Sequence, residues 1–358
     1  MNLVILCGGI GSRLWPMSRK NKPKQFFEII SDQPMIVDTY KRLAGYYPAD
    51  QLYFATTPEF VEEIKKIFPK VKDSNILIEP QRRDTGPAMG YAAARLFLKS
   101  PDEPLAFIPS DHYIGNIKKF IKTLKVAEKL ILETGRMIDI SIEPNFPSTI
   151  LGYTKLGDNH QVIDGVDIYK FAGHTEKPDF ETARKYLRTG NYLWHASYYM
   201  WTPRLFLDAY KKYAPEMYQG LEKVMAGLKT GNQRLIEEEY SRLEKISIDY
   251  AITEKMDLAD VLIIKGDFGW SDVGSWDVLF DRLSAETDSD GNLLKGNCLS
   301  VDTKKTMVYG SPEKVTAIIG LSGMVVIDTK DALLICPTGK AQEVKKIIQK
   351  LKEEGLDQ

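Results

Sequence analysis

The sequence predicts an α/β protein in which a doubly wound parallel sheet is followed by a small β-rich domain. Three observations support this fold. Short apolar runs alternate with helical patterns over the N-terminal two thirds of the chain, as they do in βαβ units. A glycine-rich segment directly follows the first apolar run, where such sheets bind their ligands. Residues 291–337 contain only short β-type pieces separated by polar turns.

The periodicity of apolar residues predicts the individual elements of the first domain in order. The chain opens with a buried strand at residues 3–6, Leu-Val-Ile-Leu. Helices are expected at 35–47, 59–68 and 87–99, and strands at 51–56, 75–79, 105–109, 137–142 and 261–265. Asp84 or Thr85 is a suitable N-cap for the third helix, and Pro87 suits its first turn.

The pattern of predicted elements changes near residues 285–290, from alternating strands and helices to short β-type pieces, and we place a domain boundary there. The first domain is expected to span residues 1–288 and the small β-rich domain residues 289–358. The second domain should contain strands at 307–309, 315–320, 324–328 and 332–335, then a Lys- and Glu-rich helix at 341–352. Its removal is expected to cost little ligand affinity, because the glycine-rich segment and the strands of the sheet precede it.

Composition excludes several classes of protein. The 358 residues carry 48 Lys and Arg against 49 Asp and Glu, a net charge of -1, which argues against a dedicated nucleic-acid binder. Three widely spaced cysteines form neither a disulfide framework nor a zinc motif. We find no signal peptide and no apolar run of membrane-spanning length, so a cytoplasmic location is expected.

Gly8, Gly9 and Gly11 follow the first strand and form a loop that suits phosphate. Glycines let backbone N–H groups approach an anion closely. A dinucleotide fingerprint would need a small residue in place of Leu14, and no Gly-Lys-Ser/Thr of a Walker loop follows. Arg13 and then Lys24 add two cations, which we expect on a surface loop facing phosphate. The alternative is a glycine-rich turn without a ligand.

Two carboxylates also lie where this fold binds ligands. Asp111 follows the strand at 105–109, and Asp272 lies in a turn-like segment after the strand at 261–265. Such a pair is suited to Mg2+, which prefers oxygen ligands. Without the ion, the two carboxylates are expected to repel each other. The alternative is that each caps a turn or a helix.

The segment around the glycines resembles the signature of the sugar-nucleotide pyrophosphorylases. It includes Gly8-Gly9-x-Gly11-x-Arg13-Leu14-Trp15-Pro16-x-Ser18-Arg19 and Pro23-Lys24-Gln25-Phe26. Further segments that resemble motifs of this family follow in order at 79–80, 83–88, 109–112, 151–153, 176–178, 247–251 and 270–276. The likeness covers essentially the whole chain and is greatest to the branch that transfers guanylyl groups to mannose 1-phosphate.

The resemblance implies a Rossmann-like nucleotidyltransferase domain and a short left-handed β-helix. It implies that the sugar phosphate attacks the α-phosphorus of GTP in line, giving GDP-mannose and pyrophosphate with Mg2+ as cofactor. The implied site residues are Arg13 and Lys24 (catalytic); Leu6, Gly8, Gly9, Gly11, Glu79, Asp84, Thr85 and Gly86 (nucleotide); Gly152, Tyr153, Glu176, Lys177 and His195 (sugar phosphate); and Asp111 and Asp272 (metal). A homodimer that binds neither nucleic acid nor membrane is expected.

The chain departs from the family pattern in two segments. It has Asp84-Thr85-Gly86 where the family usually has Asn-Thr-Ala, and Trp194-His195-Ala196-Ser197 where the family usually has Trp-Asn-Ser-Gly. The second segment is expected to contact the sugar, so a different hexose 1-phosphate is an alternative substrate. A non-catalytic nucleotide-sugar-binding subunit is another alternative, although such a protein should have lost the charged residues that this chain keeps. A dehydrogenase is disfavoured by the mismatch of the glycine loop.

Overall fold

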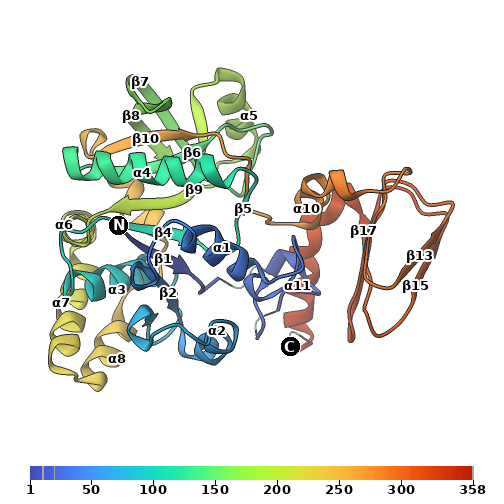
Figure 1. Ribbon diagram of the computed structural model, residues 1–358, viewed down its shortest axis with the longest axis horizontal. Helices are drawn as coiled ribbons and strands as arrows, with labels where there is room; N and C mark the ends of the chain where they lie inside the picture. The colour runs from blue at the N-terminus through green and yellow to red at the C-terminus, as the bar shows by residue number, and fades with distance from the viewer. Residues whose placement is uncertain (10–11, 20, 357–358) are drawn as a thin grey trace. The chain divides into compact units, whose positions relative to one another are not determined.

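The computed structural model describes residues 1–9, 12–19 and 21–356, and its largest element is a mixed β-sheet (Figure 1). The strands lie in the order β3-β2-β1-β4-β9-β6-β10-β8-β7. Their bounds are β1 Asn2–Leu6, β2 Leu52–Thr56, β3 Ile76–Ile78, β4 Leu105–Pro109, β6 Met137–Ile142, β7 Tyr153–Ile163, β8 Val166–Thr175, β9 Tyr192–Trp201 and β10 Val261–Gly266. All of the strands predicted for the first domain are present.

The parallel part of this sheet is the one that the βαβ pattern predicts. Strands β1 to β4 pair in parallel, as do β6 and β10. The sheet also contains an antiparallel strand that the sequence did not predict, because β9 runs antiparallel to both β4 and β6. Strands β7 and β8 form an antiparallel hairpin closed by Asp164 and Gly165, both with positive φ. Such two-residue turns match the twist of antiparallel strands.

Helices lie on both sides of the sheet and beside it. Their bounds are α1 Met35–Ala44, α2 Val61–Ile67, α3 Thr85–Phe97, α4 Ile117–Thr134, α5 Phe180–Thr189, α6 Pro203–Tyr213, α7 Pro215–Thr230, α8 Gln233–Arg242 and α9 Ile248–Ala251. Helix α4 packs on β6, β9 and β10, and α3 packs against α6 and α7 (Figure 1). The side chain of Asp84 accepts from the Thr85 N–H at 2.7 Å, which confirms a cap at this end of α3.

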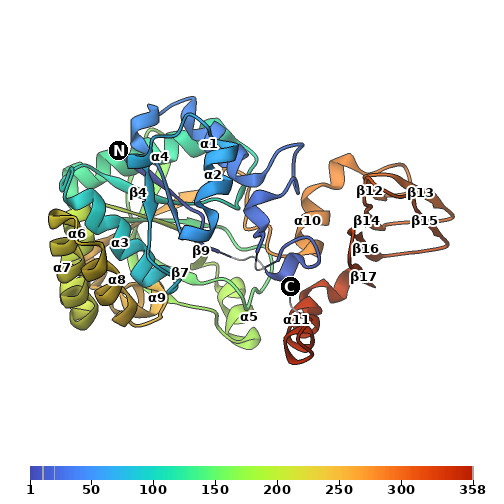
Figure 2. The same ribbon diagram turned by 90° about the horizontal axis from the view of Figure 1, so that it is seen from below.

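The C-terminal part of the chain is built from short strands in successive coils (Figure 2). Their bounds are β12 Leu293–Lys295, β13 Cys298–Val301, β14 Met307–Tyr309, β15 Thr316–Ile319, β16 Met324–Asp328 and β17 Leu333–Pro337, with helices α10 Trp276–Arg282 and α11 Val344–Glu353 on either side. Strand β14 pairs in parallel with β12 and β16, and β13 pairs in parallel with β15. This is the stacking of a β-helix. The left-handed coil expected from the sequence stays a prediction.

The N-terminal segment that carries the signature shares a hydrophobic core with this β-helix. Leu14, Ile29 and Met35 belong to one buried cluster with residues from the C-terminal elements, among them Leu293, Met307, Tyr309, Val325, Ile327, Leu334, Ala341 and Val344. The Tyr309 hydroxyl also donates to the backbone carbonyl of Ile29 at 2.7 Å. We therefore revise the expectation that residues 289–358 can be removed at little cost to nucleotide binding, because they support this segment.

The chain accordingly forms two compact units that are each discontinuous in sequence. One unit comprises Met1–Gly8, Tyr40–Pro109 and Ile114–Trp270, and the other comprises Gly9–Thr39, Ser110–Tyr113 and Ser271–Gln358. Two short strands, β5 Tyr113–Ile114 and β11 Trp270–Ser271, lie where the units join along the chain. The division at residue 288 stays a prediction. Within the described ranges, every helix is too short or too polar to span a bilayer.

Candidate functional site

The glycine loop begins directly at the end of β1. A Cβ atom on Gly9 would meet nothing within 4 Å, so its backbone is open to a ligand. A Cβ on Gly8 would lie 3.5 Å from the Glu79 carboxylate, and Gln25 donates to the Gly9 carbonyl at 3.2 Å. Gly11, expected to bind nucleotide, lies outside the described residues.

Lys24 joins two segments that are remote in the sequence. Its ammonium group lies 3.0 Å from the Asp111 carboxylate and donates to the backbone carbonyls of Asp272, at 3.0 Å, and Val273, at 3.3 Å. The expectation that Lys24 lies on a surface loop is wrong, because the residue is 7% exposed. Its three acceptors explain this burial, since a buried ammonium group needs partners.

Asp111 is ionised in this arrangement. Burial opposes the charge, but the neighbouring Lys24 outweighs it and holds the pKa of Asp111 below its usual value. Lys24 therefore compensates the charge of Asp111, and the expected repulsion between Asp111 and Asp272 stays a prediction. The carboxylates of Asp111 and Asp272 are hard oxygen donors, the kind that Mg2+ prefers. The two residues thus fit a divalent metal.

Arg13 lies beside the second carboxylate. Its Nη2 atom is 4.0 Å from Oδ2 of Asp272, while its Nη1 atom is buried without a hydrogen-bond partner. A Cβ on Gly274 would lie 2.4 Å from the Asp272 carboxylate and 3.1 Å from Arg13, so only glycine fits there. An unpaired guanidinium nitrogen in a compact turn is suited to a phosphate oxygen.

The residues expected to recognise the base gather at the ends of β1 and β3 and at the start of α3. Leu6 pairs with Ala55 and Pro109 at the end of β1. Glu79 is 5% exposed, and its carboxylate accepts from the Tyr240 hydroxyl. Burial raises the pKa of Glu79 to about 7, although that hydrogen bond opposes the shift.

Thr85 and Gly86 contact another part of the chain. The Thr85 hydroxyl accepts from the Ile248 N–H at 2.9 Å, and the Gly86 N–H donates to the Ile246 carbonyl at 3.0 Å. A Cβ on Gly86 would lie 2.6 Å from that carbonyl oxygen. Packing alone therefore requires a glycine here. Asp84 and Thr85 are exposed, and a contact of this segment with the base stays a prediction.

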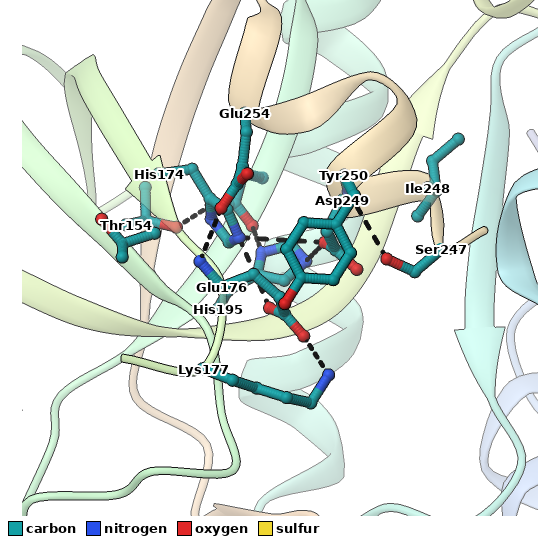
Figure 3. Close-up of polar contacts among 12 residues, drawn as sticks. Thr154, His174, Glu176, Lys177, His195, Ser247, Ile248, Asp249, Tyr250 and Glu254 are labelled. Carbon is teal, nitrogen blue, oxygen red and sulfur yellow. Dashed lines mark hydrogen bonds and ion pairs between the residues drawn. The ribbon is translucent and has the colours of Figure 1, made fainter. Parts of the chain in front are cut away.

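The residues expected to bind the sugar phosphate do come together, with one exception. Figure 3 shows Glu176 and Lys177 paired just beyond β8, with His195 of β9 close by. The His195 N–H donates to the Gly152 carbonyl at 2.9 Å, and a Cβ on Gly152 would lie 2.5 Å from the Glu176 carboxylate. Tyr153 is the exception, because its ring is fully buried and its hydroxyl accepts from the Ser148 N–H at 2.8 Å.

His195 belongs to a buried charged cluster. Its Nδ1 atom lies 2.8 Å from the Asp139 carboxylate, which also accepts from Ser141 and Thr154. Burial opposes a charge on His195, but Asp139 and other acids raise its pKa to about 9. Burial likewise opposes the charge on Glu176, but the neighbouring His174 and Lys177 lower its pKa to about 2.

Sequence reasoning missed four members of this cluster: Asp139, His174, Tyr199 and Asp249. Asp249 lies in the motif at 247–251, and the motif alone assigns it no role. The others lie on β6, β8 and β9, and only the antiparallel register brings them together. An acid or histidine inside an apolar strand is the signal that could have revealed them, since buried charges occur with partners.

Comparison with known proteins places the chain in a family. The model of the nucleotidyl transferase family matches residues 2–289, and the model of the mannose-phosphate isomerase/GMP-like β-helix domain matches residues 296–351. Mannose-1-phosphate guanylyltransferase of Escherichia coli K12 is 33% identical over 98% of this chain and 73% of its own length. The enzyme ManC of Salmonella typhimurium is 34% identical over the same shares.

A solved structure resembles the chain over its whole length. The crystal structure described as mannose-1-phosphate geranyltransferase from Thermus thermophilus has a TM-score of 0.86 and 30% sequence identity, covering 98% of this chain and 99% of that one. These likenesses confirm the expected fold, a Rossmann-like nucleotidyltransferase domain followed by a β-helix. The chain belongs to the nucleotidyl transferase family and, within it, to the mannose-1-phosphate guanylyltransferases.

Proposed function

We propose that the chain transfers the guanylyl group of GTP to mannose 1-phosphate, yielding GDP-mannose and pyrophosphate. The observation that carries this proposal is the identity of one third, over 98% of the chain, to relatives named for that reaction. The charged residues that the reaction needs are all kept, which argues against a non-catalytic subunit.

The triphosphate is bound by backbone and cationic groups of the second unit. The open backbone at Gly9 and the unpaired nitrogen of Arg13 are suited to phosphate oxygens. Lys24 contributes positive charge beside them, while its contacts with Asp111 and Asp272 fix its position. Charge that is held in place before the reaction stabilises the transition state without reorganisation.

The sugar phosphate needs no general base. A phosphate monoester with a second pKa of about 6 is already largely ionised at neutral pH and can attack the α-phosphorus directly. The Lys177 side chain is 52% exposed, so it can reach a phosphate in solvent. Its partner Glu176 suits the hydroxyl groups of a sugar. Catalysis rests on alignment and on neutralisation of charge.

Nucleotidyl transferases generally use a divalent metal, and we propose Mg2+ held by the Asp111 and Asp272 carboxylates. When bound, the ion supplies neutralisation of the charge on the phosphates. Lys24 holds the segments of Asp111 and Asp272 together, and Arg13 partly neutralises the negative charge of the Asp272 carboxylate.

A second candidate is guanylyl transfer to a different hexose 1-phosphate. One observation favours it. His195 stands where the family usually has asparagine, and ion pairing with Asp139 makes it a cation instead of a neutral amide. A charged group in this segment offers a sugar hydroxyl only donors, whereas an amide offers donors and an acceptor.

The test is pyrophosphate release measured over a grid of four nucleoside triphosphates and several hexose 1-phosphates. GTP with mannose 1-phosphate should give the highest kcat/KM. A higher rate with GTP and another hexose would favour the second candidate. A preference for UTP or dTTP would overturn the assignment.

We further propose that the protein is a cytoplasmic homodimer assembled through the β-helix. Leu299 and Val301 of β13 are 62% and 55% exposed, and Ile319 of the adjacent β15 is 73% exposed. Contiguous exposed apolar side chains mark association surfaces. A second copy of the chain would cover this apolar face.

A further inference from the structure

Four side chains converge in the first unit with their ligating atoms directed at one another (Figure 3). They are His174 at the end of β8, Glu176 just beyond it, His195 of β9 and Asp249 of α9. The His174 Nε2 atom lies 3.6 Å from Oε2 of Glu176 and 3.8 Å from Oδ1 of Asp249. The His195 Nε2 atom lies 3.7 Å from the same Asp249 oxygen.

The two imidazoles are buried without partners for these nitrogens. The His174 side chain is fully buried, and neither of its ring nitrogens makes a hydrogen bond. The His195 side chain is 3% exposed, and its Nε2 atom also lacks a hydrogen-bond partner. Buried polar atoms are almost always paired, so unpaired ones call for an explanation such as a missing ion.

The spacing of the cluster fits a metal better than it fits hydrogen bonds. Separations of 3.6–3.8 Å exceed hydrogen-bond length. Tetrahedral sites with metal–ligand bonds of about 2.0–2.2 Å place neighbouring ligand atoms roughly 3.3–3.6 Å apart. His174, Glu176 and Asp249 each offer one ligand atom, and the three atoms lie within 4.8 Å of one another. His195 lies outside this group of three and approaches it through Asp249, so its ring would have to move inward to become the fourth ligand.

The surroundings hold each ligand in place. Asp139 accepts from Nδ1 of His195 at 2.8 Å, which orients the ring with Nε2 toward Asp249. A metal ion bound at Nε2 would displace the proton that the cationic ring otherwise carries there. A carboxylate behind a ligating histidine is the usual outer partner in metal sites. The Tyr199 hydroxyl donates to Asp249, and Lys177 pairs with the other oxygen of Glu176. The absence of a side chain at Gly152 leaves the Glu176 carboxylate its space.

We propose that His174, His195, Glu176 and Asp249 form a binding site for a divalent transition-metal ion of the zinc class. Two imidazoles and two carboxylates suit Zn2+ in donor type and number, and the two negative charges match a dication. The site uses none of the carboxylates proposed for Mg2+. It shares Glu176 and His195 with the segments expected to contact the sugar, so its Zn2+ affinity is measured in the absence of substrate. Its ion would link β8, β9 and α9.

The test uses the full, tag-free chain after treatment with a chelator. Zn2+ is titrated against a chromophoric competitor at pH 7.5, and Co2+ absorption reports the coordination geometry. We expect one Zn2+ per chain with a submicromolar Kd and the intense visible bands of four-coordinate Co2+. His174→Ala and Asp249→Asn should each weaken binding at least 100-fold, and Asp139→Asn should weaken it 10- to 100-fold.

Glu254→Gln is the matched control. Glu254 accepts from the Glu176 N–H at 3.0 Å but offers no ligand, and glutamine retains the acceptor. This variant loses one nearby negative charge and should bind Zn2+ within about threefold of the parent chain. Melting curves of each metal-free variant identify chains that fail to fold, and the less disruptive His195→Asn then replaces them.

No saturable Zn2+ binding below 100 μM would overturn the proposal. Equal weakening by Glu254→Gln and His174→Ala would also overturn it, because it would indicate general charge attraction. The rate of guanylyl transfer, measured separately with Mg2+, distinguishes failure of this proposal from failure of the proposed function.

Discussion

The ammonium group of Lys24 lies 3.0 Å from the carboxylate of Asp111. The same ammonium group donates to the backbone carbonyl of Asp272, so one side chain contacts both residues proposed for the metal. Removal of Lys24 would leave the charge of the Asp111 carboxylate uncompensated. Lys24 therefore contributes both to the stability of the fold and to the proposed catalysis, whereas Arg13 is expected to contribute to catalysis alone.

Arg13→Ala should lower activity with little effect on folding. The Arg13 side chain is 31% exposed, and its ion pair with Asp272 is long. We expect kcat/KM to fall about 10²- to 10³-fold, as for other single groups that stabilise transition-state charge, with a melting temperature near that of the parent. Lys119→Ala, which removes an exposed pair with Asp267, is the control and should change neither quantity. A large drop in melting temperature for Arg13→Ala would identify a structural role.

Lys24→Ala should lower both activity and stability. Loss of its buried contacts should cost about 1–3 kcal/mol of unfolding free energy, in addition to the loss of rate. Urea unfolding and initial rates measured on the same preparation test this. A variant as stable as the parent would show that the contacts of Lys24 contribute nothing net.

Asp111→Asn and Asp272→Asn should each reduce kcat about 10²-fold or more and raise the Mg2+ concentration needed for half-maximal rate. Loss of one ligand disables a shared ion, so the double variant should lose little beyond either single one. Multiplicative losses in the double variant would mean that the two residues act independently.

The stability of the protein should depend on His195 between about pH 6.5 and pH 9. The pKa of His195 is raised to about 9, above its unfolded value of about 6.5. The ion pair with Asp139 therefore stabilises the fold fully below pH 6.5, and this contribution disappears as the pH rises through 9. The melting temperature of the parent, relative to that of His195→Asn, should fall across this window. A constant difference would contradict the assigned ion pair.

Truncating a β-helix core residue should loosen the signature segment. Ile327→Ala removes a fully buried side chain that shares a cluster with Leu14 and Ile29 and should cost about 2–5 kcal/mol. Hydrogen exchange should then accelerate in residues 21–39. Ile263→Ala, equally buried in β10, is the matched control and should leave that segment protected. Unchanged hydrogen exchange in residues 21–39 of both variants would show that the β-helix core does not stabilise this segment.

The proposed dimer is tested by Ile319→Glu. A buried charge at the interface is costly, so light scattering should report a monomer. Leu132→Glu, at a 64% exposed position on α4, should leave the oligomeric state unchanged. A dimer that survives Ile319→Glu would place the interface elsewhere.

The sequence predicted the strands best where apolar residues form short continuous runs. The strands at 52–56 and 105–109 are buried on both faces and read as continuous apolar runs, as parallel strands do. Strand β9 was not predicted, because aromatic residues face both sides of it and no alternation appears. Strands β7 and β8 carry many polar residues, so a sheet pattern was hidden there as well.

The same distinction applies to the site. Lys24 and Asp111 were found because each belongs to a compact motif, and the structure brings them together. The cluster of His174 and Asp249 was missed because its members lie 75 positions apart and meet only through the fold. Gly86 shows a further limit. The resemblance assigns it to the nucleotide site, yet its close packing against the Ile246 carbonyl alone accounts for a glycine.

The core shared by Leu14, Ile29 and Val344 has a consequence for how the protein is made. During synthesis, residues 9–39 leave the ribosome long before the residues that cover them exist. Domains normally fold in the order of their emergence, but this segment must wait until residues as far along as Val344 have emerged. A prematurely terminated product can pair β1 with its neighbours while its phosphate loop lacks support. The fold thereby makes support of the phosphate loop conditional on translation as far as Val344.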